Sequence, residues 1–243
     1  MHRFYADGLG EIGSLVTLSE EDARHASRVL RMQPGDAAEL LLDGRRFSAE
    51  IAEMTAEGVT ARLISELPST EAKLRITLYQ GLPKAEKMEL IVQKAVELGA
   101  ARVVPVAMSR CVVQLSAKDG AKKQERWQKI AASAAAQSGR GRIPQVLVLP
   151  SFEDAVQRAA GCELALFPYE NEHALSLRRA IGSAQAKTVS IMTGPEGGFS
   201  DEEVLFAQHA GLQVCTLGPR ILRCETAPLC ALSAVLFAAG ALD

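Results

Sequence analysis

Cysteine is scarce in this chain of 243 residues, and none of its five cysteines forms a Cys-x-x-Cys pair. Because the number is odd and the spacings are irregular, neither a disulfide framework nor a zinc site is expected. The first residues also lack the apolar stretch of a secretory signal, so export is not indicated. A reducing compartment fits these absences best, and we expect a cytoplasmic protein.

Long hydrophobic runs are missing as well. An uncharged run at residues 227–242 has 16 residues and contains Pro228 and Gly240, whereas a helix needs roughly 20 apolar residues to span a bilayer. We therefore expect a buried helix and no membrane partner. Hydrophobic residues make up 48% of the chain and charged residues 23%, which is typical of globular proteins and argues against disorder, collagen-like repeats and coiled coil.

Net charge is small, at -2, and by itself indicates no class of partner. Its distribution is uneven. Residues 1–70 hold 7 Lys and Arg against 12 Asp and Glu, and the remaining residues hold 20 against 17. The basic excess is densest at residues 118–142, where seven Lys or Arg accompany two acids. The local arrangement of charge, and not the total, is therefore informative about partners.

Short strand-like runs separated by turns predict a small antiparallel barrel near the N-terminus; the runs are 38–42, 47–54 and 59–65. One helix interrupts this pattern, with Ser19 and Asp22 resembling a capping box before an apolar stripe flanked by arginines. Proline and small polar residues at 68–70 predict a linker. We therefore expect one domain at residues 1–70 and a second at residues 71–243.

Strands alternate with helices in the second domain. This alternation predicts an α/β fold with a mostly parallel sheet covered by helices on both faces. The expected strands are 74–82, 103–107, 146–149, 164–167, 189–192 and 214–217, and the expected helices include the segments around 88–99 and 127–135.

Two loops that follow expected strands are unusual. In parallel sheets, ligands bind beyond the carboxyl ends of strands. Residues 193–200 hold three glycines, which allow close approach of a ligand to the backbone, and Ser200 with Glu203 resembles a capping box. A tight strand-to-helix turn is the alternative. The loop lacks the Gly-Lys-Ser/Thr of a P-loop and the Gly-x-Gly-x-x-Gly spacing, so ATP hydrolysis and NAD chemistry are disfavoured.

The second loop, residues 217–227, places two arginines and a carboxylate beside the same expected cleft. Alternatively, these charges cap and pair at a helix start. Residues 137–142 combine arginines with glycines, which suits phosphate contacts but also a solvated helix end. His25 has no metal-ligating neighbours in sequence, so no metal is expected. No Ser/His/Asp or Cys/His arrangement indicates covalent catalysis.

Taken together, the segments 194–198 and 217–227 resemble the two signature segments of the ribosomal RNA small-subunit methyltransferase E family, which belongs to the SPOUT methyltransferases. The resemblance extends to residues 84–89, 93–99, 137–140, Arg3-Phe4 and 25–31, and so covers nearly the whole chain. The chain departs from the family pattern at Ala136, where Glu is usual, and at Cys224, where Thr is usual.

The resemblance implies a PUA-like β-barrel that binds RNA, followed by a trefoil-knotted parallel-sheet SPOUT domain that binds S-adenosylmethionine. The knot rests on the resemblance alone, because true knots are rare among folds. The resemblance further implies a homodimer that methylates N3 of a uridine in small-subunit (16S) rRNA, as naked rRNA or within the assembled small subunit.

Site residues follow from the same resemblance. It implies cofactor contacts by Leu166, Phe167, Thr193, Gly194, Pro195, Glu196, Gly197, Gly198, Leu217, Gly218, Ile221 and Leu222. It implies RNA contacts, mostly through phosphates, by Arg3, Arg24, Arg28, Arg31, Arg140 and Arg142.

Methylation of uracil N3 requires loss of the imide proton, and negative charge then spreads onto O2 and O4. We expect Glu225 to serve as or to position the base and Arg223 to stabilise the developing charge. Burial would raise the pKa of Glu225 and Arg223 would lower it, so the sequence leaves the direction of the shift open.

The segment 229–239 is apolar on every side, and a helix of this kind must be buried all round, so a second subunit is expected to cover it. Three alternatives stay open. One is a non-catalytic RNA-binding or ribosome-assembly factor, a second is a SPOUT enzyme with another RNA target, such as tRNA or a ribose, and a third is a nucleotide-using metabolic enzyme.

Overall fold

The structure, a computed structural model, describes residues 2–8, 10–182 and 186–242. The chain forms two compact units. Unit 1 comprises Met1–Glu71 and Ala135–Ile143, and unit 2 comprises Ala72–Ala134 and Pro144–Asp243. The division into one domain at residues 1–70 and another at residues 71–243 stays a prediction. The structure adds that residues 135–143 group with the N-terminal unit.

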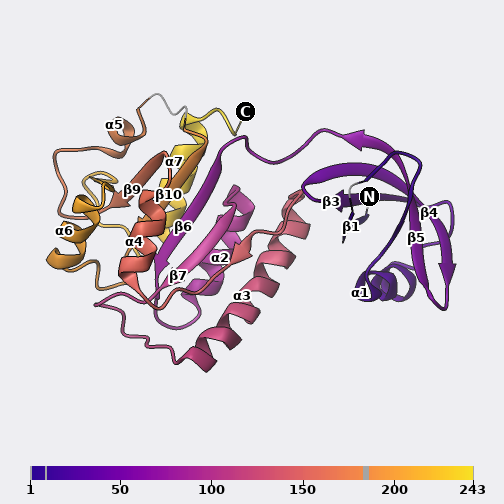
Figure 1. Ribbon diagram of the computed structural model, residues 1–243, viewed down its shortest axis with the longest axis horizontal. Helices are drawn as coiled ribbons and strands as arrows, with labels where there is room; N and C mark the ends of the chain where they lie inside the picture. Colours follow the sequence, from indigo (N-terminus) through magenta and orange to yellow (C-terminus); the bar gives the residue numbers. More distant parts are fainter. Residues whose placement is uncertain (1, 9, 183–185, 243) are drawn as a thin grey trace. The chain divides into compact units, whose positions relative to one another are not determined.

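Unit 1 contains a five-stranded sheet in the order β1-β3-β4-β5-β2 (Figure 1). The hairpins β3–β4 and β4–β5 are antiparallel, as the alternating pattern predicts. β1 pairs with β3 in parallel, so the prediction of a wholly antiparallel barrel is wrong there. The long connection between β1 and β3, which contains β2 and a helix, is what permits the parallel crossover. The strands are β1 (His2–Ala6), β2 (Leu15–Thr17), β3 (Ala37–Leu42), β4 (Arg45–Thr55) and β5 (Gly58–Leu67).

The predicted helix of unit 1 is present as α1 (Glu20–Arg24), which continues as a π-helical turn η1 (His25–Val29). Ser19 caps it, because its Oγ accepts a hydrogen bond from the backbone N–H of Asp22 at 3.1 Å. Ala26 is fully buried in the unit's core. The arginines beside it stay exposed.

Hydrogen bonds to Glu71 and Thr70 explain why residues 135–143 belong to unit 1. Arg140 Nη2 lies 2.6 Å from Glu71 Oε2, and Gly141 donates its N–H to Glu71 Oε1 at 2.8 Å. The Thr70 hydroxyl donates to the Gly139 carbonyl at 2.7 Å. Tyr5 adds a hydrogen bond from its hydroxyl to the Arg140 carbonyl at 2.8 Å.

Unit 2 is built on a six-stranded sheet in the order β11-β9-β10-β6-β7-β8. Every strand pairing of this sheet in the described ranges is parallel, as predicted from the alternation of strands and helices. The strands are β6 (Arg75–Gly81), β7 (Arg102–Val106), β8 (Gln145–Val146), β9 (Leu164–Pro168), β10 (Thr188–Thr193) and β11 (Gln213–Cys215).

Helices cover both faces of this sheet (Figure 1). α4 and α6 lie over one face, and α2 and α7 pack together on the other. α2 ends at Leu98 and is followed by Gly99, whose φ of 112° provides a left-handed cap. The helices are α2 (Lys87–Leu98), α3 (Ala117–Ser138), α4 (Phe152–Ala160), α5 (Leu177–Ile181), α6 (Asp201–His209) and α7 (Thr226–Ala238).

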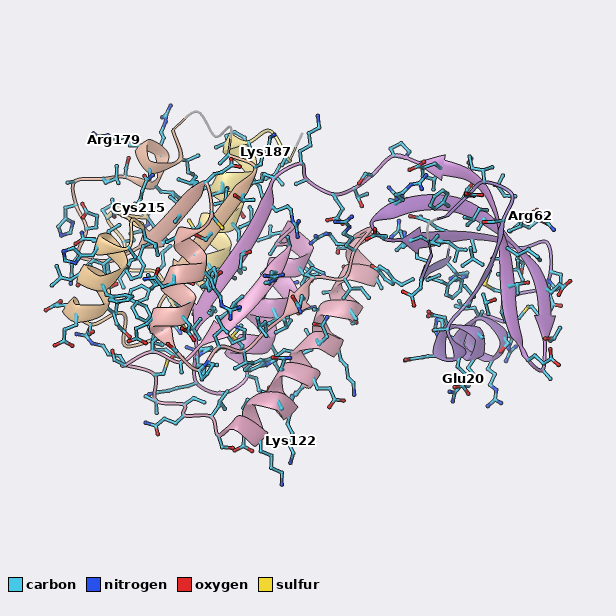
Figure 2. All side chains as sticks on the ribbon, in the orientation of Figure 1. Glu20, Arg62, Lys122, Arg179, Lys187 and Cys215 are labelled. Carbon is cyan, nitrogen blue, oxygen red and sulfur yellow. The ribbon has the colours of Figure 1, made fainter. Side chains whose placement is uncertain are left out.

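Apolar and charged side chains separate as expected. Cys215 is buried within unit 2, while Lys122 projects from α3 into solvent (Figure 2). None of the helices in the described part of the chain combines the length and apolarity that a membrane crossing requires.

Candidate active site

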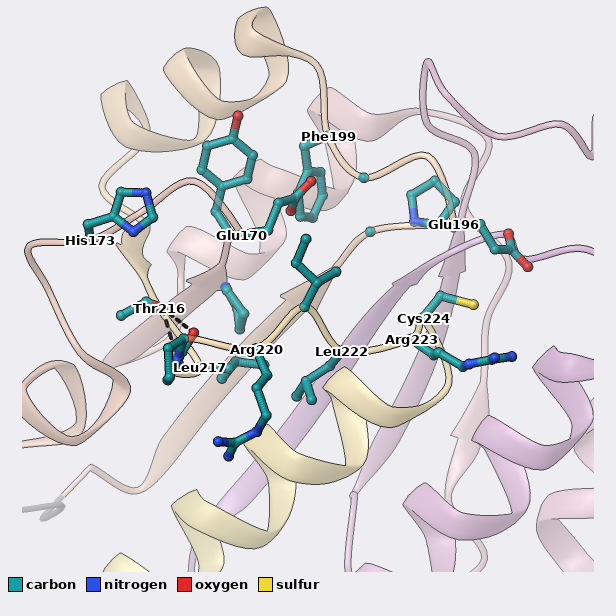
Figure 3. Close-up of a pocket in the computed structure, with 18 of the residues that line it drawn as sticks. Glu170, His173, Glu196, Phe199, Thr216, Leu217, Arg220, Leu222, Arg223 and Cys224 are labelled. Carbon is teal, nitrogen blue, oxygen red and sulfur yellow. Dashed lines mark hydrogen bonds between the residues drawn. The ribbon is translucent and has the colours of Figure 1, made fainter.

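A cavity of about 380 Å³ opens at the carboxyl edge of the unit 2 sheet (Figure 3). It is lined by residues from three loops, which follow β9, β10 and β11. Parallel strands bring their carboxyl ends to one edge, where ligands of α/β proteins bind. Small-molecule sites typically measure about 300–1,000 Å³. The cavity is therefore a candidate site for a small ligand.

Side chains and backbone of β6 fix the loop after β10. The Thr193 hydroxyl donates to Gln80 Oε1 at 2.7 Å, and Gln80 Nε2 donates to the Gly194 carbonyl at 2.9 Å. A Cβ atom on Gly81 would lie only 2.6 Å from the backbone nitrogen of Pro195. Glycine at position 81 is thus required for the close approach of the loop to β6.

The same loop turns sharply before α6. Gly198 donates its N–H to the Pro195 carbonyl at 3.0 Å and has a φ of 66°, a conformation that favours glycine. Ser200 and Glu203 then form the predicted capping box. The turn leaves little space, since a Cβ atom on Gly198 would collide with the Glu170 carboxylate.

The loop after β11 is less enclosed. Gly218 donates its N–H to Thr216 Oγ1 at 3.1 Å, and Ile221 is 86% exposed. The guanidinium groups of Arg220 and Arg223 point away from each other (Figure 3). Arg223 is exposed at the rim of the cavity.

Lys87, the first residue of α2, joins the two loops. Its ammonium lies 3.0 Å from Glu196 Oε1 and 3.3 Å from Glu225 Oε2. The hydrogen bonds with Glu196 and Glu225 raise the pKa of Lys87. Burial raises the pKa of Glu196, but hydrogen bonds from its own backbone N–H and from Lys87 outweigh it and lower that pKa. Lys87 is therefore a permanent cation in this cluster.

Cys224 completes the cluster. Its thiol donates to Glu225 Oε2 at 3.2 Å, and burial raises the pKa of the Cys224 thiol to about 12. The hydrogen bond from Cys224, followed by those from its own backbone and from Lys87, lowers the pKa of Glu225. The pKa of Glu225, whose direction of shift the sequence leaves open, is thus lowered. Glu225 is a carboxylate at neutral pH, and Cys224 is a neutral thiol.

Most predicted cofactor residues line the cavity, but four do not. Leu166 and Phe167 are fully buried in the strand, and the cavity takes Pro168, Tyr169 and Glu170 from this strand end instead. Thr193 turns its hydroxyl inward to Gln80, and Gly197 packs beside Arg110. The predicted residues that line the cavity are Gly194, Pro195, Glu196, Gly198, Leu217, Gly218, Ile221 and Leu222.

The predicted RNA-contacting arginines all belong to unit 1. Arg24 and Arg142 are exposed and carry local ion pairs with Glu20 and Asp43. Arg3 pairs with Glu39, which is itself buried. Arg28 and Arg31 are exposed.

Arg140 differs from the other predicted RNA-contacting arginines. It is 5% exposed, and its guanidinium is held by the Glu71 carboxylate. The structure thus gives it a role in packing, and its contact with RNA stays a prediction. The adjacent Gly139 and Gly141 do not free its side chain, because the backbone N–H of Gly141 is bound to the same carboxylate.

Sequence reasoning missed Lys87 and Glu170 as site residues. Lys87 follows β6, which neighbours β10, so the rule that ligands bind beyond the carboxyl ends of strands points to it. Glu170 follows β9 by two residues. In the described ranges, no three His, Cys, Asp or Glu side chains gather in a way that could hold a metal ion.

Comparison with known proteins bears on this geometry. An RNA methyltransferase domain family matches residues 70–236, and an RNA methyltransferase PUA domain family matches residues 18–64. The ribosomal RNA small subunit methyltransferase E of Bacillus subtilis is 38% identical over 229 residues, which are 91% of this chain and 89% of that protein. The chain belongs to the ribosomal RNA small-subunit methyltransferase E family.

Solved structures of similar proteins agree. Ribosomal RNA small subunit methyltransferase E from Neisseria gonorrhoeae, bound to S-adenosyl methionine, is 34% identical with a TM-score of 0.85 and covers 98% of this chain and 97% of its own. A methyltransferase from Legionella pneumophila in complex with S-adenosylmethionine is 36% identical, has a TM-score of 0.82 and covers 97% of each chain.

Membership of the methyltransferase E family confirms the resemblance noted in the sequence. It also confirms the α/β class with a parallel sheet and an N-terminal PUA domain. The two signature segments of the family, residues 194–198 and 217–227, are the stretches that form the loops after β10 and β11 and the start of α7. These loops wall the cavity.

Proposed function

We propose that this protein uses S-adenosylmethionine to methylate N3 of a uridine in small-subunit rRNA. The observation that carries the proposal is the cavity at the carboxyl edge of the unit 2 sheet, whose walls include the two signature loops of the family. Two similar proteins have been solved with this cofactor bound.

The cavity suits the cofactor in size and lining. Glycines at 194, 198 and 218 leave backbone open to a ligand, and Pro195, Leu217 and Leu222 offer apolar surface to an adenine ring. Glu170 supplies a carboxylate of the kind that accepts hydrogen bonds from ribose hydroxyls. When bound, S-adenosylmethionine supplies the methyl group, carried on a cationic sulfonium.

Glu225 and Arg223 are proposed to act on the uracil. The Glu225 carboxylate accepts or directs the N3 proton, and the exposed Arg223 guanidinium stabilises the charge that spreads onto O2 and O4. A lowered pKa makes Glu225 a modest base. Arg223 therefore has to acidify the imide by stabilising its anion.

Mass spectrometry of rRNA nucleosides from cells that lack and then regain the protein tests the function. Restoration of 3-methyluridine supports it, and an unchanged nucleoside profile contradicts it. Arg223→Ala should reduce methyl transfer to small subunits by about 10²–10³-fold, as removal of a group that stabilises transition-state charge does. Full activity of this variant would disprove the role of Arg223.

RNA phosphates are proposed to meet the exposed arginines of unit 1. Arg24, Arg28 and Arg31 lie on or directly after the α1–η1 helix, and Arg3 and Arg142 complete the set. Because such contacts release counterions, affinity for rRNA should fall steeply as salt rises. An affinity that stays flat between about 50 and 200 mM salt would contradict this path.

A homodimer is proposed from α7 and the loop before it. Phe237 is 73% exposed and Ile221 is 86% exposed, although α7 also buries Ala231 and Leu232 on its other side. Apolar side chains left uncovered on an already packed helix mark a surface for a second subunit. Sedimentation should show a dimer at micromolar concentration, and a monomer would contradict the proposal.

The cytoplasm is the proposed compartment, and the proposed substrate is small-subunit rRNA, either naked or within the assembled small subunit. All five cysteines are free, which suits a reducing environment. Methylation of purified subunits but not of naked rRNA would support the assembled form, and the reverse would exclude it.

A further inference from the structure

Lys87 occupies a position that helix electrostatics alone disfavours. It is the first residue of α2, where the helix dipole presents its positive end and acidic residues are the usual choice. A lysine at this position costs stability unless carboxylates offset its charge. Local rules of this kind are broken mainly at functional sites.

The partners of Lys87 come from two distant segments. Glu196 belongs to the loop after β10, and Glu225 precedes α7, so one ammonium contacts both signature loops. Glu196 and Cys224 lie side by side at the end of the cavity away from Glu170 and His173 (Figure 3). The side chains of Lys87, Glu196 and Glu225 are 33%, 27% and 20% exposed. Ion pairs this accessible contribute little to folding stability.

We propose that Lys87 is a positioning residue of the methyl-transfer site, whose ammonium holds the Glu225 carboxylate in place for removal of the uracil proton. This inference rests on the proposed function. Lys87 acts through Glu225 and does not need to touch the substrate. The hydrogen bond from Cys224 is the largest cause of the lowered pKa of Glu225, and the Lys87 ammonium adds to it by favouring the ionised carboxylate.

The cofactor loop does not depend on Lys87 alone. The Lys84 backbone N–H donates to Glu196 Oε1 at 3.1 Å, Gln80 holds Gly194, and Arg110 Nη1 donates to the Gly197 carbonyl at 3.2 Å. Glu225 has no comparable set, since its carboxylate contacts only Lys87 and Cys224 among the side chains described. Loss of Lys87 should therefore disturb proton removal much more than cofactor binding.

The test is a double-mutant cycle on kcat for methyl transfer to small subunits, with affinity for S-adenosylmethionine measured by calorimetry. Lys87→Met should lower kcat by about 10–100-fold, as misplacement of a catalytic group does, and change cofactor affinity less than about threefold. In the Glu225→Gln background the same substitution should lower kcat less than about threefold, because it acts through the group already removed. Lys87→Arg should restore most of kcat.

Lys94→Met is the matched control, because Lys94 lies on the same helix and pairs only locally with Glu97 at 2.8 Å. It should leave kcat unchanged. A Lys87→Met variant with the kcat of this control, or one whose loss is equally large in the Glu225→Gln background, overturns the proposal. If Lys87→Met does not fold, kcat is compared between Lys87→Arg and Lys87→Gln. The proposal expects a high kcat only for the charged variant Lys87→Arg, and an equally high kcat for Lys87→Gln overturns it.

Failure of the proposed function would look different. A wild-type protein that neither binds S-adenosylmethionine nor methylates rRNA overturns that function and the role of Lys87 together. A wild-type protein that is active, beside an unimpaired Lys87→Met variant, overturns the role of Lys87 alone.

Discussion

Two clusters of ion pairs differ between the units. In unit 1, Arg140 pairs with the single carboxylate of Glu71, and in unit 2, Lys87 pairs with two carboxylates, those of Glu196 and Glu225. The Arg140 and Glu71 side chains are 7% and 21% exposed, and Glu71 also accepts hydrogen bonds from the backbone N–H groups of Gly141 and Arg142. The side chain of Lys87 is 33% exposed, and its two carboxylates leave the cluster of three charges negative.

The difference separates a structural ion pair from one that is available for chemistry. The opposite charges of Arg140 and Glu71 balance each other, and removal of either side chain leaves the other without its partner in a largely buried position. Lys87 is shared by two carboxylates and is more accessible, so loss of its ion pairs leaves charges that water can reach. Burial and charge balance therefore distinguish the two clusters, although every ion pair in them has an N···O distance between 2.6 and 3.3 Å.

Arg140→Ala is expected to have the largest effect on stability, lowering the free energy of unfolding by about 3–5 kcal/mol. It leaves Glu71 half-buried without its guanidinium partner. Urea denaturation at neutral pH measures the loss. The double variant Arg140→Met with Glu71→Met should recover most of it, because both charges are gone. A loss below about 1 kcal/mol for the single variant would show that the pair is not structural.

Acid should weaken unit 1 through the same pair. Burial raises the pKa of Glu71, but Arg140 and the backbone N–H groups outweigh it and hold the pKa below its usual range. The stability that this carboxylate contributes is present above its unfolded pKa of about 4.3 and is lost as pH falls through the lower folded pKa. Urea midpoints between about pH 6 and pH 3 should fall less in Glu71→Gln than in the wild type. Parallel curves would contradict the assignment.

Gly81→Ala should have an intermediate effect centred on the cavity. The new Cβ would meet Pro195 and the Met108 sulfur, and overpacking of this kind costs about 1–3 kcal/mol. Affinity for S-adenosylmethionine should fall, as calorimetry can show, because the loop after β10 is displaced. Gly120→Ala is the control, since the atom nearest to a Cβ at position 120 is Val148 Cγ1, at 3.9 Å. Unchanged cofactor affinity in Gly81→Ala would mean that this loop does not hold the ligand.

The smallest effect is expected for Arg28→Ala, which alters neither ion-pair cluster. If Arg28 contacts one phosphate, the slope of log affinity for rRNA against log salt should become shallower by about 0.9. Filter binding at several salt concentrations measures the slope. Arg62→Ala, which removes another exposed arginine of unit 1 outside the proposed set, should leave the slope as it is. Equal slopes for both variants and the wild type would exclude Arg28 from the RNA path.

Local chemistry made much of the fold predictable. Asp43 and Gly44 both have positive φ, as the expected hairpin turn requires, and the caps at Ser19, Gly99 and Ser200 depend only on neighbouring residues. The parallel pairing of β1 depends on a partner more than 30 residues away, which no local pattern encodes. The trefoil knot stays a prediction for the same reason.

The site was predictable where backbone chemistry decides it. Gly194, Gly198 and Gly218 follow strands and line the cavity as expected. Side-chain direction was not predictable: Phe167 packs against Phe199 with ring centroids 4.1 Å apart, and Thr193 turns to Gln80. The sequence around Arg140 predicts a nucleic-acid contact, whereas the hydrogen bonds from its guanidinium to the Glu71 carboxylate appear only in the structure.

The segment Ala135–Ile143 has a consequence for how such a protein can be divided or recombined. It lies more than 60 residues downstream of Glu71, yet it completes the unit that begins at the N-terminus. A gene fragment that ends at the apparent linker, residues 68–70, would encode the five strands but would lack both Glu71 and the segment that binds it. Transfer of the whole N-terminal unit to another protein therefore requires two separate segments of the chain.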